Sequence, residues 1–100
     1  MTVHWTDTAI EHLIGIHEYI ASDSPQYALR TVDRITGRSK QLAAHPFSGA
    51  MVPEYEQRDI REVIERPYRI IYRVKPDQID VLAVIHGAHL LPPTVAELGE

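Results

Sequence analysis

Apolar side chains in the first part of the chain recur with the spacing of an α-helix. Before this pattern, residues 3–5 are β-prone and long enough for one edge strand. Thr6-Asp7-Thr8 then offers three N-cap candidates, and Thr8 with Glu11 has the spacing of a capping box. The pattern therefore predicts an amphipathic helix over residues 8–21. Its stripe is formed by Ala9, Ile10, Leu13, Ile14, Ile16, His17 and Ile20.

A second helix is expected directly after a short break. Ser24 is placed to cap it and Pro25 to occupy its first position, and His45-Pro46 ends it. Its outer side presents arginines at i, i+4 spacing, namely Arg30, Arg34 and Arg38. Its apolar stripe is formed by Ala28, Leu29, Val32, Ile35, Ser39, Leu42 and Ala43. The two helices should form a hairpin with a loop of about four residues.

The second half of the chain changes to an alternating pattern. Residues 46–57 have little periodicity and are expected to form a loop. Residues 60–65, 68–75 and 79–86 then alternate apolar and polar positions, which predicts three strands in an antiparallel meander. Leu82 and Val84 indicate that the last strand is covered on both sides. Residues 90–100 are expected to form a short helical turn or a flexible tail.

These elements predict an α+β fold of one domain over residues 1–100. An N-terminal edge strand and an antiparallel two-helix hairpin would pack on a small antiparallel sheet. The helices would shield one face. The other face, with Arg69, Ile71, Arg73 and in one reading Arg61, would stay open and carry the function.

Composition limits the classes of protein that remain. One hundred residues with 44% apolar content and no cysteine fit a single globular domain without disulfides. The longest apolar run, residues 81–85, is far shorter than the roughly 20 residues of a membrane span. The first residues lack the basic and apolar regions of a signal peptide. A cytoplasmic protein without membrane contact is therefore expected.

Charge is distributed unevenly along the chain. The net charge of −4 is unusual for a general nucleic-acid binder. Residues 1–29 contain acidic but no basic residues, whereas residues 58–75 contain six of the ten basic ones. Two interpretations stay open: a polarised binding surface, or a solvated strand face with balanced pairs.

The histidines and the sequence motifs offer few chemical options. Six histidines are present, but only His86 and His89 have a spacing that suits a metal, and a tight site needs three or four ligands. No metal is expected. The sequence also lacks phosphate-loop, nucleophile-elbow and HExxH motifs, so no cofactor is expected.

Cleavage of RNA is the remaining chemical option, since it needs a base, an acid and cations around the phosphate. The residues of suitable type are Arg61, Arg69, Tyr72, Arg73, His86 and His89. Tyr72, however, is in register with Ile70 and Val74, which favours a packing role. Arg69 and Arg73 could equally dock an acidic partner without catalysis.

Several phrases along the chain resemble one known family. The first half carries Trp5-Thr6, Tyr19-Ile20-Ala21-x-Asp23-x-Pro25-x-x-Ala28 and Leu42-x-x-x-Pro46-x-x-Gly49. The second half carries Arg61, Tyr68-x-Ile70-x-Tyr72 and Val81-x-x-Val84-x-His86-Gly87-Ala88. In this order they resemble the RelE/ParE toxins of type II toxin–antitoxin modules, over residues from about 3 to 89. The fold of that family matches the predicted elements.

The resemblance implies one of two activities. RelE-like members cut mRNA on the ribosome, whereas ParE-like members inhibit DNA gyrase. The helical hairpin phrase and the His86-Gly87-Ala88 ending are closer to the ParE branch. The acidic net charge and residues 52–56, where the nuclease branch commonly has lysines, favour the same branch. A ParE-like gyrase inhibitor, causing growth arrest and plasmid stabilisation, is therefore expected.

The resemblance also implies a partner and a site. A ParD-like antitoxin, with a DNA-binding N-terminus and a disordered C-terminal segment, would bind the toxin in a heteromeric complex. Its acidic residues, or the target, would meet Arg61, Arg69 and Arg73, and the toxin would contact operator DNA little or not at all. In the nuclease alternative, Arg61 and Arg73 would clamp phosphate, and His86 or His89 would transfer protons.

The chain departs from the family pattern at two positions. Ala50 follows Gly49 where many members have arginine, and His89 takes the place of another arginine. These changes leave further readings open: a weakened toxin, or a toxin with a different target. A decayed toxin kept only as a regulatory partner of its antitoxin is another.

Overall fold

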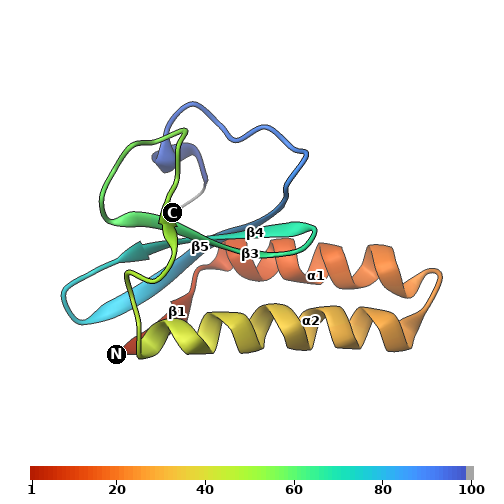
Figure 1. Ribbon diagram of the computed structural model, residues 1–100. Coiled ribbons are helices and arrows are strands. Elements are labelled where there is room, and N and C mark those ends of the chain that lie inside the picture. The colour runs from red at the N-terminus through yellow and green to blue at the C-terminus, as the bar shows by residue number, and fades with distance from the viewer. Residues whose placement is uncertain (99–100) are drawn as a thin grey trace.

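The computed structural model describes residues 1–98, in which two helices lie on one face of a five-stranded sheet (Figure 1). The predicted α+β fold is confirmed. Among these residues, none of the helices is long and apolar enough to cross a membrane. The elements in chain order are β1 (Thr2–Trp5), α1 (Asp7–Ala21), α2 (Pro25–Lys40), η1 (Gln41–Ala43), β2 (Ala50–Met51), β3 (Ile60–Glu65), β4 (Tyr68–Val74), β5 (Gln78–His86) and η2 (Val95–Leu98).

The sheet has the strand order β1-β5-β4-β3-β2. The meander β3–β4–β5 is antiparallel, as its alternating pattern predicts. The N-terminal strand lies at an edge, as expected, and it pairs with β5 in parallel, from Thr2 opposite Gln78 to Trp5 opposite Val81. The sheet is therefore mixed, since this parallel pair adds to the antiparallel pairs of the other strands.

Polar side chains set where the two helices begin. The Thr6 hydroxyl accepts a hydrogen bond from the Ala9 N–H at 3.2 Å and donates to the Val81 carbonyl of β5 at 2.9 Å. Thr6, not Thr8, is thus the N-cap, because it also lies at the end of β1 within reach of β5. Ser24 caps α2 by accepting from the Tyr27 N–H, with Pro25 in the first position as predicted.

The helix-side core is built around Tyr72, whose side chain is fully buried. Its hydroxyl donates to the Pro46 carbonyl at 2.8 Å and accepts from the Gly49 N–H at 3.1 Å. A Cβ at Gly49 would collide with this hydroxyl and with the Glu62 carbonyl, so only glycine fits. Tyr72 is a packing residue that fixes the segment before β2. The buried cluster around it comprises Ala9, Ile35, Leu42, Val63, Ile70, Ile79, Val81 and Val84.

The opposite face of the sheet is also covered, so the prediction of an open face was wrong. A register shift opposite Ile71 and Tyr72 leaves Leu82 as an additional residue in β5, and Leu82 and Ala83 then both pack on this face. Irregular segments provide the cover, and the Tyr55 hydroxyl ties them together by donating to the Pro92 carbonyl at 2.9 Å (Figure 1). This second core comprises Val52, Ile60, Ile71, Leu82, Ala83, Val95 and Leu98.

The two hydrogen bonds of the buried Tyr72 hydroxyl give a direct test of this packing. We expect Tyr72→Phe to lower the free energy of unfolding by about 1–3 kcal/mol, because the Gly49 N–H is left buried without its acceptor. Urea unfolding measures the difference. Tyr27→Phe removes a hydroxyl from a half-exposed ring and should change stability by less than about 0.5 kcal/mol. Equal losses in the two variants would contradict the structural role of Tyr72.

Candidate functional site

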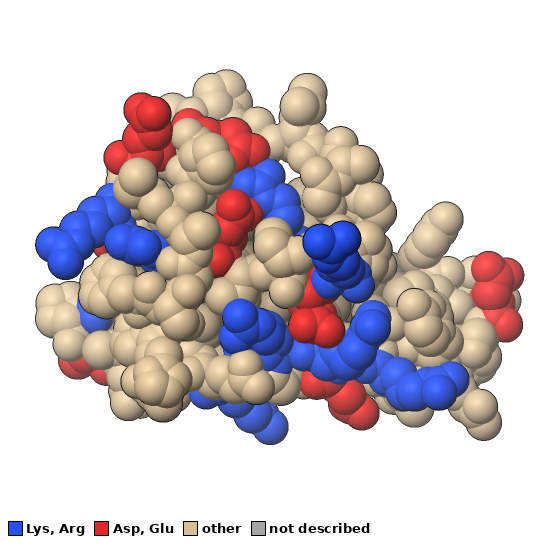
Figure 2. Space-filling view, in the orientation of Figure 1, with Lys and Arg blue, Asp and Glu red and all other residues tan. Residues whose placement is uncertain are grey.

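The structure separates the three arginines that the sequence placed on one surface. Arg69 and Arg73 lie on the same face of β4 as Ile71, because side chains alternate along a strand. Arg61 pairs with Tyr72 and therefore lies on the helix side of the sheet. Basic side chains are accordingly spread over the molecule, and their longest run follows α2 (Figure 2).

Arg69 is engaged by two carboxylates of the chain itself. Its Nε lies 2.5 Å from Glu62 Oε1, and its two terminal nitrogens donate to the Glu54 carboxylate at 2.8 and 2.9 Å. The hydrogen bonds that Arg69 donates to Glu54, opposed by burial and reinforced by Glu62, raise the pKa of Arg69, and the same contact lowers the pKa of Glu54. Only 13% of the Arg69 side chain is exposed. A partner carboxylate can reach it only by displacing Glu54.

Arg73 and Arg61 also hold the segment between α2 and β3 against the sheet. Arg73 Nε lies 3.6 Å from Asp59 Oδ2. Arg61 donates to the carbonyl oxygens of Arg58 at 2.8 Å and Gly49 at 3.2 Å. It also lies over the exposed Phe47 ring, 5.1 Å from the centroid. For Arg69 and Arg73, the structure supports the interpretation of balanced pairs on a strand face.

His86 and His89 lie at the other end of the sheet. The His86 ring meets Tyr68 edge-on at 5.9 Å and lies 5.6 Å from the His89 ring, and its Nδ1 accepts from the Ala88 N–H at 3.1 Å. Because Tyr68 pairs with His86 while Arg73 pairs with Asp80, about 17 Å of strand separates the histidines from Arg73. The four residues of the nuclease alternative are therefore not brought together.

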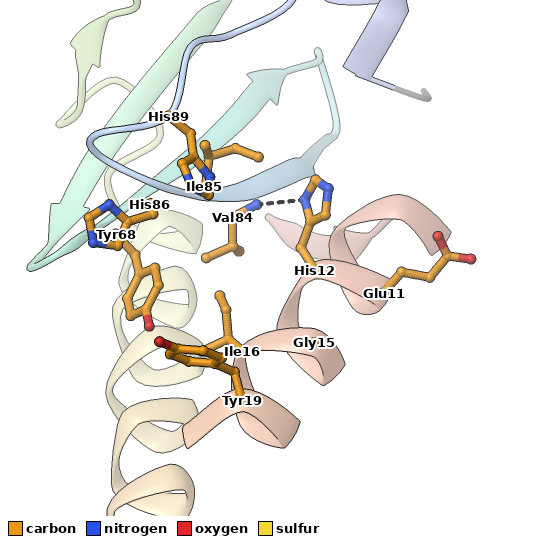
Figure 3. A pocket seen from close by; sticks show the side chains of 10 residues that line it. All are labelled: Glu11, His12, Gly15, Ile16, Tyr19, Tyr68, Val84, Ile85, His86 and His89. Atoms are coloured by element: carbon orange, nitrogen blue, oxygen red, sulfur yellow. Dashed lines mark hydrogen bonds between the residues drawn. The ribbon is translucent and has the colours of Figure 1, made fainter. Parts of the chain in front are cut away.

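A hollow of about 690 Å³ lies between α1 and the end of the sheet where the two histidines are found. Ile16 and Tyr19 of α1 face Tyr68 and Ile85 across it, and the hydroxyl ends of Tyr19 and Tyr68 point toward each other (Figure 3). Tyr19 is 82% exposed. The sequence pattern does not predict this site, because its walls come from segments roughly 50 to 80 residues apart. Its one signal was Tyr19, a large ring on the polar side of a helix.

His12 closes one side of the hollow by a hydrogen bond to β5. Its Nδ1 accepts from the Val84 N–H at 3.2 Å (Figure 3). Pairing between β1 and β5 ends at Trp5 and Val81, so the imidazole takes the place that a longer β1 would fill. Burial lowers the pKa of His12, and the charge of Glu11 opposes this shift. The neutral ring is the form that can accept this hydrogen bond.

The described part of the chain contains no group of three or more His, Cys, Asp or Glu side chains arranged to hold a metal ion. His86 and His89 approach each other at the rim of the hollow, but His86 Nδ1 is already occupied by the Ala88 N–H. Apolar, aromatic and hydrogen-bonding side chains line this end of the molecule.

Comparison with known proteins identifies the class of protein to which this fold belongs. A chain from the chromosomal ParDE toxin–antitoxin system of P. aeruginosa superposes with a TM-score of 0.72 at 30% identity, over 86% of this chain and 95% of that one. The fold is thus that of the RelE/ParE-type toxins. The family model of the ParE toxin of the type II toxin–antitoxin system parDE matches residues 3–91. The chain belongs to this family, and a cognate antitoxin is its implied partner.

Two curated relatives agree with this assignment. The toxin-family protein Y4kP of Sinorhizobium fredii is 36% identical over 90 residues, which cover 90% of this chain and 92% of that protein. Toxin RelE2 of Caulobacter vibrioides is 32% identical over 89 residues, which cover 88% of this chain and 97% of that toxin. Both similarities extend over nearly the whole domain.

The contact between His12 and Val84 predicts a dependence of stability on pH. Because the folded state lowers the pKa of His12, the neutral ring contributes its full stability above the ordinary value of 6.5, and this contribution is lost as the pH falls below it. The urea midpoint should therefore fall from pH 7 to pH 5 by more in the wild type than in His12→Gln, whose amide oxygen can accept but does not titrate. The same fall in both proteins would contradict this role.

Proposed function

We propose that the chain inhibits DNA gyrase as a ParE-type toxin, acts in the cytoplasm and is neutralised by a ParD-like antitoxin. Membership of the ParE family and the likeness to a ParDE chain support this proposal. The observation that carries it is the separation of the groups that a nuclease would need. General acid–base chemistry requires the proton-transferring group and the cations to contact one phosphate. The distance of about 17 Å between the histidines and Arg73 does not allow this.

An mRNA endonuclease is the second candidate. The similarity to Toxin RelE2 favours it, as do two exposed histidines next to each other at the rim of a hollow. In that case the phosphate would bind near His86 and His89, and Arg61 and Arg73 would have no contact with it. The nuclease would therefore need cationic side chains other than Arg61 and Arg73, which the sequence analysis proposed as phosphate clamps.

For the antitoxin, the hollow between α1 and β5 is the proposed docking site. It offers apolar and aromatic surface beside a sheet edge, which suits an amphipathic segment that folds on binding. Arg61, Arg69 and Arg73 remain the proposed charged contacts to the antitoxin or the target. At Arg69 the contact requires an exchange, because the incoming carboxylate must replace Glu54.

A supercoiling assay tests the gyrase proposal. We expect the purified toxin to inhibit supercoiling of relaxed plasmid by gyrase and ATP, and to yield linear DNA after protease treatment. Addition of the antitoxin should restore supercoiling. In parallel, mRNA in a translating extract should stay intact. Loss of mRNA without any effect on gyrase would contradict the proposal and support the nuclease, with His86 and His89 as the first residues to replace.

The docking proposal predicts that Tyr19 contributes strongly to antitoxin affinity. Tyr19→Ala should weaken the complex by about 2 kcal/mol, roughly 30-fold, because a large exposed ring at the mouth of the hollow is lost. Titration calorimetry measures this change. Leu29→Ala is the matched control, since it removes a residue that is 58% exposed on α2 and outside the hollow. The proposal fails if the two variants bind the antitoxin equally well.

A further inference from the structure

The helical hairpin is electrically polarised. α1 carries three acidic residues and no basic one, whereas α2 carries four basic residues and one acidic one. Its basic residues are Arg30, Arg34, Arg38 and Lys40. Figure 2 shows a band of basic side chains along this part of the surface. One side of the molecule is therefore cationic, although the net charge of the whole chain is −4.

Three of these arginines form a straight row. Each step of four residues along a helix advances about 6 Å and turns by only about 40°, so Arg30, Arg34 and Arg38 cover about 12 Å on one stripe. Arg30 is exposed, and the side chain of Arg34 is 44% exposed with a loose contact of 3.9 Å to Glu65. Arg38 donates to the Gln41 side chain at 3.0 Å.

The row continues toward the loop before β2. Burial raises the pKa of Tyr72, and the charges of Arg61 and Arg38 both oppose this rise. Arg61 donates to the Gly49 carbonyl and the Gly49 N–H donates to the Tyr72 hydroxyl, so the Arg61 guanidinium lies near this hydroxyl. Arg58 lies over the Phe47 ring at 5.6 Å, beside Arg61. The cationic band thus extends from the middle of α2 across to β3.

The fold gains little from this arrangement. Like charges at i, i+4 on a helix repel one another and destabilise it, and exposed ion pairs such as Arg34 with Glu65 contribute little. Arg69 and Arg73 differ from this row, because carboxylates on the same sheet face hold them. Arg30 and Arg34 are exposed and Arg38 is half-buried, and a row of arginines from which the fold gains little points to a binding role.

We propose that the arginine row Arg30–Arg34–Arg38 on α2 binds the phosphate backbone of duplex DNA without reading its bases. Arginine is well suited to phosphate, and contacts to the backbone carry no sequence information. A convex helix surface can lie against a duplex, whereas a single strand requires a groove with stacking platforms. The row offers only Tyr27 as an aromatic ring on its stripe.

An acidic peptide is a weaker match to this row. Peptide docking depends on apolar anchors at the centre of the interface, and these lie in the hollow beside α1. An antitoxin bound there would leave the row on α2 open to DNA. The inference goes beyond gyrase inhibition and holds whichever target the toxin has. It replaces the expectation, implied by the family resemblance, that the toxin contacts operator DNA little or not at all.

Fluorescence anisotropy of a labelled duplex of about 20 base pairs with the full-length toxin tests this proposal. Three phosphate contacts should give a slope of log affinity against log salt near −2.7, and so weaken binding about 40-fold between about 50 and about 200 mM salt. In the double variant Arg30→Gln/Arg34→Gln only one phosphate contact remains, so the same change of salt concentration should weaken duplex binding only about 3.5-fold.

A control variant separates the row from the net charge. Thr2→Glu/Ala96→Glu changes the net charge by the same amount at exposed positions on β1 and η2, and its slope should stay that of the wild type. Titration with the antitoxin confirms that each variant is folded. The proposal is overturned if the wild type does not bind duplex, if it binds a single strand of that length more tightly, or if the control loses as much slope as the arginine variant. A loss of antitoxin affinity in the arginine variant, with duplex binding unchanged, would assign the row to the antitoxin instead.

Discussion

Every layer of this molecule is attached to β5. Residues Ile79 to Val84 of this strand are all buried, so it must satisfy apolar packing on two faces and hydrogen bonding along two edges. β4 and β1 pair with it from opposite sides. Where β1 ends, Thr6 and then His12 continue the contact to Val81 and Val84 from α1. The position of the helical hairpin, and with it the hollow beside α1, therefore depends on this one strand.

Local sequence signals were sufficient to predict most helices and strands, but they did not predict which segments cover the second face of the sheet. The helices and the strands β1, β3, β4 and β5 are found within a few residues of their expected bounds, because periodicity and capping residues act over short distances. The short strand β2 was not expected, because it lies in the segment 46–57 that was predicted to be a loop. The packing role of Tyr72 also followed from its register with Ile70. The second core did not, because Val52, Val95 and Leu98 come from segments without periodicity. Leu82 did indicate that β5 is covered on both sides, but no local pattern marks the register shift by which this additional residue reverses the alternation.

The candidate site shows the same limit. The candidate arginines and histidines were named from the sequence, yet their grouping depends on which face of a strand each side chain takes. Arg61 lies opposite Tyr72 and therefore on the other face of the sheet from Arg69 and Arg73. Tyr68 lies opposite His86, and about 13 Å of strand separates Tyr68 from Tyr72, so Arg61 is also distant from the histidines. The hollow is made by α1, β4 and β5 together. Sequence spacing alone carries no information about that contact.

The ion pairs of Arg69 change how a mutational scan of this family member is to be interpreted. Glu54 occupies the guanidinium before any partner arrives, so that an incoming carboxylate exchanges one ion pair for another. The net number of charge contacts is then unchanged, and affinity gained at this position should depend only weakly on ionic strength. Replacing Arg69 removes the ion pair that holds Glu54 against the sheet. A weaker complex after such a change would report the disorganised surface of the free toxin as much as a lost contact.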